Sequence, residues 1–269
     1  MDIMEINFTI KSELYDIPAV FCQPDTDGLL PAVILCHGTA SCKNEVGNLF
    51  IHLARSLAEK GIASIRFDFA GCGESTARQQ DFTFYREVDD TEKVYVYLCQ
   101  HEKVDAGRIG ILGFSQGARV MAEFLGRHPK EIKTAVSWSG ACHNGIGVFV
   151  GWFKYYDEAC NKGYAQIPIP WRSHLDLILP KKWFDEIRDS SPLDSLSQYE
   201  GAMLAVSGTK DILVPYAHAR EIAQACRKSR LAEALIIEQA DHTFNVLEKD
   251  KSIAEKVVGH TASWIAKTI

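Results

Sequence analysis

Short apolar runs alternate with segments of helical periodicity along most of the chain. A continuous apolar run bounded by polar residues is typical of a strand buried on both faces of a sheet. Such runs predict strands at 31–36, 62–67, 108–113, 132–138, 202–207 and 234–238. Apolar residues three and four positions apart predict helices over 45–60, 82–102, 116–127, 216–228 and 248–267. Strands separated by helices indicate a mostly parallel sheet with helices on both faces.

Two stretches depart from this alternation. Residues 4–23 contain two strand-like runs with no helix between them, which predicts an antiparallel hairpin at one edge of the sheet. About sixty residues separate the strand ending near 138 from the one starting at 202. Their central part, 143–195, contains the aromatic residues Phe149, Trp152, Phe153, Tyr155, Tyr156, Tyr164, Trp171, Trp183 and Phe184. A connection this long usually has its own structure and often covers an active site, so we expect a cap here, with an extra helical pair as the alternative.

Composition and charge exclude several classes of function. The 269 residues carry a formal net charge of −6 and no basic run, which argues against nucleic-acid binding. The N-terminal sequence lacks the apolar core of a signal peptide, and no apolar run approaches the ~20 residues of a membrane span. The 8 cysteines form no C-x-x-C pair and are expected as thiols in a reducing compartment. We therefore expect a cytoplasmic protein with no membrane segment.

The segment Gly113-Phe114-Ser115-Gln116-Gly117 matches G-x-S-x-G between a predicted strand and a predicted helix. This is the context in which the motif presents a nucleophilic serine on a tight turn. The glycines two positions before and after the serine remove side chains that would collide with the neighbouring backbone. Ser115 is therefore the candidate nucleophile, at the carboxyl end of the sheet.

A serine hydroxyl needs a base to take its proton, and the base needs an acid to orient it. His242 lies in the loop after the last predicted strand, at the same end of the sheet as Ser115. Asp211 follows the strand at 202–207 and also lies at that end. The order serine, aspartate, histidine is that of the α/β-hydrolases. Two rival acids are less suitable, because Asp241 adjoins the histidine in sequence and Asp68 is better placed to fix the turn at 71–75.

An acyl-transfer site also needs donors for the developing oxyanion. The backbone N–H of Gln116, directly after the nucleophile, is the first expected donor. The loop after the strand at 31–36 is expected to supply the second, and there we assign the backbone N–H of Thr39. His37, at the start of this loop, is interpreted as a structural residue that fixes it.

With these residues in place, the sequence resembles the α/β-hydrolases of the serine esterase type from His37-Gly38 to His242. The turn Asp68-x-x-Gly71-x-Gly73-x-Ser75 is similar to one found after the fourth strand in many members. Gly-x-Ser-Gln-Gly, Gly-Thr-Lys-Asp and Ala-Asp-His-x-Phe are most similar to cinnamoyl and feruloyl esterases and related bacterial carboxylesterases. Those esterases usually carry an aromatic residue where this chain has Thr39. The resemblance implies the α/β-hydrolase fold, a mostly parallel sheet with a cap inserted between the sixth and seventh strands.

Ser115, Asp211 and His242 are expected to form one site, and a domain boundary anywhere between 115 and 242 would break it. We therefore predict one domain over 1–269 with a cap subdomain at 143–195. The predicted function is hydrolysis of a small or aromatic ester by Ser115, with no cofactor or metal. Thioesterase, amidase, peptide hydrolase, acyltransferase and a non-catalytic ligand receptor are the alternatives. In the cap, the expected substrate contacts are His143, Trp152, Trp171 and Trp183. The aromatic cap also suits a dimer interface, so a homo-oligomer stays open.

Overall fold

One mixed sheet of eight strands forms the centre of the protein, in a computed structural model that describes residues 2–169 and 176–269. The strand order is β1-β2-β4-β3-β5-β6-β9-β10. The bounds are β1 Ile3–Lys11, β2 Asp16–Pro24, β3 Leu30–Cys36, β4 Ala63–Phe67, β5 Val104–Phe114, β6 Ile132–Trp138, β9 Ala202–Gly208 and β10 Leu231–Ile237. Strand β2 pairs antiparallel with both β1 and β4, and the other pairs of neighbouring strands are parallel. The predicted parallel sheet with an antiparallel hairpin at one edge is therefore confirmed.

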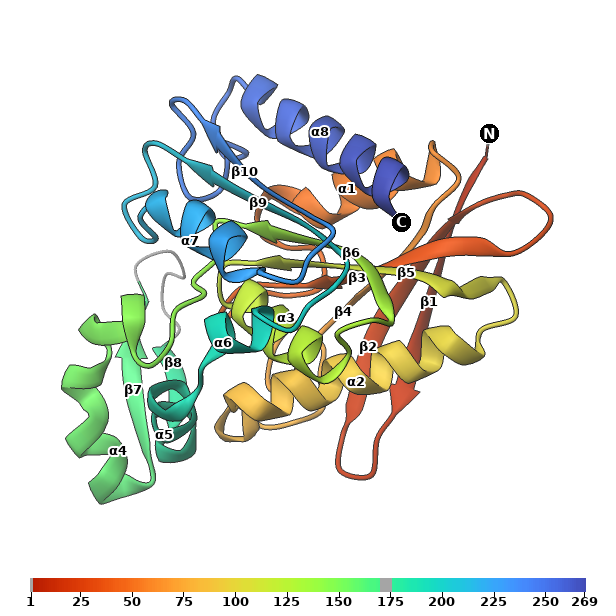
Figure 1. The fold of residues 1–269 in the computed structure, drawn as a ribbon. Coiled ribbons are helices and arrows are strands. Elements are labelled where there is room, and N and C mark those ends of the chain that lie inside the picture. The colour runs from red at the N-terminus through yellow and green to blue at the C-terminus, as the bar shows by residue number, and fades with distance from the viewer. Residues whose placement is uncertain (1, 170–175) are drawn as a thin grey trace.

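Helices cover both faces of the sheet (Figure 1). Their bounds are α1 Leu49–Ala58, α2 Phe84–Gln100, α3 Gln116–Arg127, α7 Ala217–Ala225 and α8 Ser252–Thr268, with a short 3-10 helix η2 at Gln79–Asp81. Helices α1 and α8 pack together on one face, and α2 and α3 on the other. In β3, Val33 and Leu35 join the apolar core under α1 and α8, whereas Ile34 joins the core under α2 and α3. A strand with both faces buried explains the continuous apolar run.

The helix predicted over 45–60 begins later than expected, at Leu49. It is preceded by the 3-10 turn η1, Val46–Asn48, in which Gly47 and Asn48 have φ of 56° and 61°. Glu45, just before this turn, also has a positive φ, of 59°, and its carboxylate accepts a hydrogen bond from the Gly38 amide. The long-range contact of Glu45 therefore replaces the first helical turn that local periodicity predicted.

The segment between β6 and β9 forms a separate small unit of the fold at the lower left of Figure 1. Its elements are η3 Gly147–Gly151, η4 Phe153–Tyr155, α4 Tyr156–Lys162, β7 Tyr164–Pro168, β8 Asp176–Pro180, α5 Lys181–Asp189 and α6 Pro192–Leu196. Strands β7 and β8 pair antiparallel in a sheet of their own. We call residues 143–195 the insertion. It lies between the sixth and seventh strands of the main sheet, as the resemblance implied, and it contains a hairpin besides helices.

A buried arginine of the main domain holds the insertion in place. Arg119 lies on α3, and its Nη2 donates to the Ile187 carbonyl at 2.8 Å and to Ser190 Oγ at 2.7 Å. The side chain is fully buried, and burial lowers the pKa of Arg119 to about 10. Within the described residues, no helix has the length and apolar character that crossing a membrane requires.

Candidate active site

Ser115 lies on the turn between β5 and α3 in a conformation that L-residues rarely adopt, with φ 53° and ψ −118°. The two flanking glycines explain how the turn is accommodated. A Cβ at Gly113 would lie 2.3 Å from the Gly117 carbonyl oxygen, and a Cβ at Gly117 would lie 2.2 Å from that of Cys36. Larger residues at either position would push the turn away from its neighbours. The strain at Ser115 is therefore imposed by close packing around it.

The structure brings Ser115, His242 and Asp211 together in one chain of hydrogen bonds. His242 Nε2 lies 3.1 Å from Ser115 Oγ, and His242 Nδ1 lies 2.7 Å from Asp211 Oδ2. The Asp211 carboxylate is fully buried, and the His242 imidazole is 13% exposed. In this arrangement Nδ1 carries a proton toward the carboxylate and Nε2 is free to accept one from the hydroxyl.

Two contacts fix the loops that carry the acid and the histidine. A Cβ at Gly208 would lie 2.2 Å from the Ala240 carbonyl oxygen, so only glycine lets the end of β9 approach the histidine loop this closely. Ser139, just after β6, donates from its hydroxyl to the His242 carbonyl at 2.8 Å. Ser139 has a φ of 45°, a second strained residue beside the site. The sequence analysis missed it, because nothing in its sequence context distinguishes it from other serines.

The two rival acids have other contacts. Asp241 Oδ1 accepts hydrogen bonds from the backbone amides of Thr243 and Asn245, both at 2.8 Å, and so stabilises its own turn. Asp68 accepts from the Glu74 amide at 3.0 Å and from Lys43 Nζ at 2.9 Å. Asp68 thus fixes the turn at 71–75, as the sequence predicted.

The loop expected to supply an oxyanion donor is tied to the nucleophile turn by side chains. Thr39 Oγ1 donates to Gln116 Oε1 at 2.8 Å, and Gln116 Nε2 donates to Glu87 Oε2. Among the described residues, the backbone N–H groups of Thr39 and Gln116 donate to no other group. His37 Nε2 accepts from the Phe69 amide at 3.2 Å, which agrees with a structural role. The two amides thus remain available to a substrate oxygen.

Two buried glutamates that the sequence analysis missed support this loop. Glu45 accepts from the Gly38 amide at 2.6 Å and from Ser41 Oγ at 2.7 Å. Glu87 is fully buried on α2, and burial raises its pKa well above the usual range. The sequence does carry a signal for Glu87, because it lies two helical turns before Val94, on a face where apolar residues are expected. An acidic residue in an apolar stripe indicates a specific partner.

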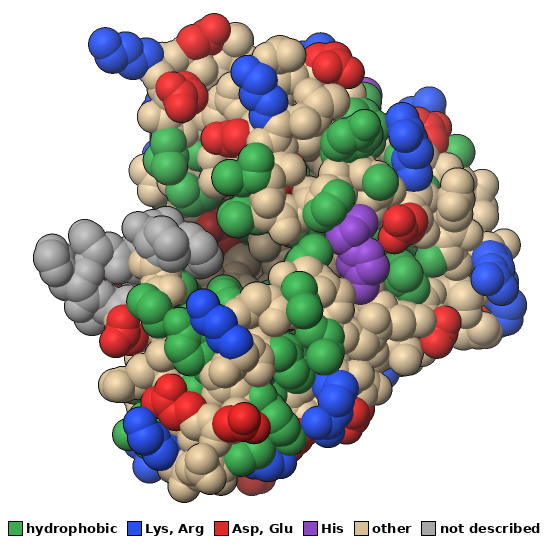
Figure 2. Space-filling view, turned by 90° about the vertical axis from the view of Figure 1, so that its left-hand side faces the viewer, with side chains coloured by type: hydrophobic (Ala, Val, Ile, Leu, Met, Phe, Trp, Pro, Cys, Tyr) green, Lys and Arg blue, Asp and Glu red, His purple; other side chains and the backbone are tan. Residues whose placement is uncertain are grey.

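A cavity of about 500 Å³ opens at Ser115 and His242. Figure 2 shows the face at the carboxyl ends of the strands, which is hollowed and carries hydrophobic side chains around the hollow. The lining includes the apolar residues Ala40, Val46, Phe114, Ala141, Val148, Phe149, Trp152, Leu213, Val214 and Leu247. The described residues that line it include no lysine or arginine, and its one carboxylate, Glu45, is held by the oxyanion loop. The cavity therefore suits an uncharged, apolar group.

Four residues of the cap were expected to contact substrate, and the structure places them differently. Trp152 lines the cavity. Trp183 does not line it, because its fully buried ring packs behind the wall, 5.7 Å from Trp152 and 5.3 Å from Phe149 between ring centroids. His143 lies away from the cavity and contacts Glu221 instead, since the start of the insertion turns toward α7. Trp171 lies outside the described residues.

Comparison with known proteins identifies the fold. Residues 31–163 match the family described as the alpha/beta hydrolase fold. An uncharacterized 31.7 kDa protein in the traX-finO intergenic region of Escherichia coli is 32% identical over 101 residues, 38% of this chain and 34% of that protein. Esterase FrsA of Photobacterium profundum is 26% identical over 139 residues, 50% of this chain and 31% of the esterase. The matched segments thus span about one third of the length of these relatives.

A solved structure with the same fold covers nearly the whole chain. Est1E from Butyrivibrio proteoclasticus, with ferulic acid bound, superposes with a TM-score of 0.75 over 97% of this chain and 100% of its own, at 18% identity. At this identity the likeness concerns the fold. The expected α/β-hydrolase fold, with a mostly parallel eight-stranded sheet, is therefore confirmed.

Proposed function

We propose that this chain, which has the α/β-hydrolase fold, is a serine esterase that cleaves a carboxylic ester through an acyl-enzyme intermediate. One observation carries this proposal: Ser115 Oγ lies 3.1 Å from His242 Nε2, and the same ring lies 2.7 Å from Asp211. A serine hydroxyl becomes a useful nucleophile only when a base within hydrogen-bonding distance removes its proton. His242 is that base, and Asp211 orients it.

In the first step, Ser115 Oγ attacks the ester carbonyl carbon while its proton passes to His242 Nε2. The carbonyl oxygen becomes an oxyanion, which the backbone N–H groups of Thr39 and Gln116 stabilise. The negative charge of Asp211 stabilises the imidazolium. The C–O bond to the alcohol then breaks, and the leaving oxygen takes the proton from His242, so the alcohol departs and the acyl group remains on Ser115.

In the second step, water takes the place of the alcohol. His242 removes a proton from the water molecule, whose oxygen attacks the acyl carbon held in the same oxyanion site. The bond to Ser115 Oγ breaks, and the serine regains its proton from His242. The free acid leaves and the enzyme is restored. These steps use the side chains of Ser115, His242 and Asp211, two backbone amides and water.

The lining of the cavity supports the proposal that the substrate has a small or aromatic acyl group, of which the cinnamoyl or feruloyl type is one example. Phe149 and Trp152 of the insertion face the same cavity as Ser115, so the insertion acts as a cap over the substrate. The sequence motifs resemble those of feruloyl esterases, and Est1E binds ferulic acid on the same fold. An uncharged ester is expected, because the described lining has no lysine or arginine to pair with an anion.

A graded set of p-nitrophenyl and methyl esters tests this function. We expect turnover of short-acyl p-nitrophenyl esters and of methyl ferulate, and no turnover by Ser115→Ala. A folded wild-type protein that hydrolyses none of these esters would contradict the proposal. Thioester, amide or acyl-transfer chemistry on the same residues is the second candidate, because fold and site geometry do not fix the leaving group. Rates on a matched ester, thioester and amide with one acyl group separate these chemistries.

A further inference from the structure

Two histidines and a glutamate meet outside the substrate cavity, between the start of the insertion and α7. His143 belongs to the insertion, whereas His218 and Glu221 lie three residues apart on α7 and therefore on one face of that helix. One potential ligand atom from each of the three side chains lies within 4.8 Å of the other two. Imidazole nitrogen and carboxylate oxygen are the donors that bind Zn²⁺ and the neighbouring divalent transition metals.

The two imidazole rings pack closely and leave nitrogen atoms unsatisfied. Their centroids are 3.5 Å apart, with the rings at 72° to each other. His218 is only 7% exposed. Among the described residues, neither His143 Nδ1 nor His218 Nδ1 has a hydrogen-bond partner, and both atoms are buried. Such orphaned buried nitrogens are unfavourable unless another group binds them.

The electrostatic environment favours a bound cation. Burial lowers the pKa of His143 and that of His218, the latter to about 4. Glu221 adds a negative charge, with Oε2 at 3.3 Å from His143 Nε2. The charged groups near the His143 and His218 rings are the carboxylates of Asp211 and Glu221 and the guanidinium of Arg119. Two anions and one cation leave a net negative charge around the two rings.

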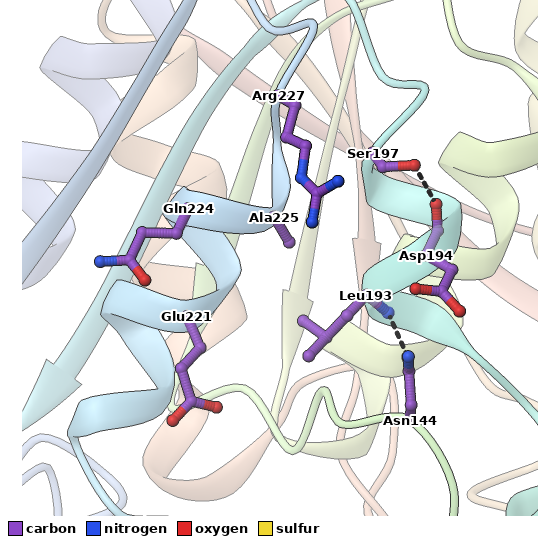
Figure 3. Close-up of a pocket in the computed structure, with 8 residues that line it drawn as sticks. All are labelled: Asn144, Leu193, Asp194, Ser197, Glu221, Gln224, Ala225 and Arg227. Atoms are coloured by element: carbon purple, nitrogen blue, oxygen red, sulfur yellow. Dashed lines mark hydrogen bonds between the residues drawn. The ribbon is translucent and has the colours of Figure 1, made fainter.

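One member of this cluster, Glu221, faces solvent. Glu221 lines a surface pocket of about 340 Å³ beside α7. Figure 3 shows Glu221 on α7 at one side of this pocket and Asn144, the neighbour of His143 in sequence, at the other. The Glu221 side chain is 47% exposed, so its carboxylate can adjust to an arriving ion.

We propose that His143, His218 and Glu221 form a binding site for a divalent transition-metal ion, for which Zn²⁺ is the probe. Three protein ligands leave a fourth tetrahedral position for water. Two nitrogen donors favour Zn²⁺ over Mg²⁺ and Ca²⁺, which prefer all-oxygen sites. The ion bonds the first residues of the insertion to α7, so it stabilises the junction between them. None of the three proposed ligands lines the substrate cavity.

Calorimetric titration of ZnCl₂ into tag-free, chelator-treated full-length protein tests the site. Wild-type protein is expected to bind one Zn²⁺ and not Mg²⁺ at the same concentration. Glu221→Gln keeps the size of the side chain but removes its charge, and it is expected to weaken binding at least tenfold. His143→Ala is expected to do the same. Glu255→Gln and His260→Ala, both exposed on α8, are matched controls that should leave the affinity unchanged.

Spectroscopy and thermal unfolding complete the test. Co²⁺ in place of Zn²⁺ is expected to give the visible absorption of a tetrahedral site in wild-type protein and not in Glu221→Gln. The melting temperature should rise with Zn²⁺ in wild type and in the α8 controls only, and circular dichroism without metal checks that each variant is folded. Absence of Zn²⁺ binding by wild type, or binding unchanged in folded Glu221→Gln and His143→Ala, would overturn the proposal.

Discussion

Asp211 orients the imidazole of His242 while its other oxygen fixes its own loop. Asp211 Oδ2 lies 2.7 Å from His242 Nδ1, and Oδ1 accepts from the amides of Leu213 and Val214 at 2.9 and 2.8 Å. The carboxylate therefore cannot rotate away without losing two backbone hydrogen bonds. The ring of His242 is held with Nε2 toward Ser115.

Asp211→Asn is predicted to lower kcat by about 10⁴-fold, the loss typical of the corresponding change in serine hydrolases. An amide NH₂ facing Nδ1 stabilises the tautomer that carries its proton on Nε2, which cannot then accept one from Ser115. Asp241→Asn should have a small effect, because Asp241 contacts only its own turn. Steady-state hydrolysis of a short-acyl p-nitrophenyl ester compares the two, and a larger loss in Asp241→Asn would transfer the acid role to Asp241.

Trp152→Ala is predicted to lower kcat/KM for aromatic acyl esters by up to about tenfold, since one aromatic contact contributes ~0.5–1.5 kcal/mol. Hydrolysis of an acetyl ester should change less, because a two-carbon acyl group does not reach the cap. Val150→Ala is the matched control: Val150 lies on η3, two residues before Trp152, is exposed and does not line the cavity. Equal losses on acetyl and aromatic esters would show that Trp152 acts on folding and not on substrate.

Arg119→Met is predicted to lower the free energy of unfolding by at least about 2 kcal/mol, because it removes the buried guanidinium that donates to the Ile187 carbonyl and to Ser190 Oγ. The insertion should also become more sensitive to limited proteolysis. Arg127→Met on the same helix removes only an exposed ion pair with Asp89, and a change within about 0.5 kcal/mol is expected. Urea denaturation measures both, and equal effects would contradict an anchoring role for Arg119.

Glu87→Gln is predicted to stabilise the protein, and the gain should grow as pH rises above the ordinary pKa of a glutamate side chain. Burial raises the pKa of Glu87 in the folded state, so the folded protein keeps a proton that the unfolded chain releases. Stability is therefore lost as pH rises from the unfolded pKa toward the folded one. Glutamine still offers Gln116 an oxygen and does not titrate. Urea denaturation at pH 5 and pH 8 checks this, with exposed Glu102→Gln as control; an advantage that does not grow with pH would contradict it.

The sheet and most helices could be predicted from the sequence because their signals are local. The apolar run of β3 and the stripe of α3 depend on burial patterns within a few residues. The strand-turn-helix context of Ser115 also pointed to the carboxyl end of the sheet, where Asp211 and His242 lie. Parallel topology places these loops at one edge, so chain order alone was enough to select them.

The rest depended on contacts between distant segments. Glu45 was expected to start a helix, but it lies outside that helix and accepts a hydrogen bond from the Gly38 amide. Trp152 and Trp183 have the same chemistry and lie close in the fold, yet only one lines the cavity, a difference set by packing around the insertion. His143 was expected at the substrate and faces Glu221 instead. Periodicity does not encode such side-chain partners.

The assignment of Ser115 as nucleophile is tested most directly with a fluorophosphonate probe, which forms a covalent bond to an activated serine oxygen as fluoride leaves. Intact-mass measurement and peptide mapping are expected to show one label on wild-type protein, at Ser115, and none on Ser115→Ala that circular dichroism shows to be folded. Asp211→Asn should react far more slowly than wild type. A wild-type protein that stays unlabelled, or a label that persists in Ser115→Ala, would contradict the proposed mechanism.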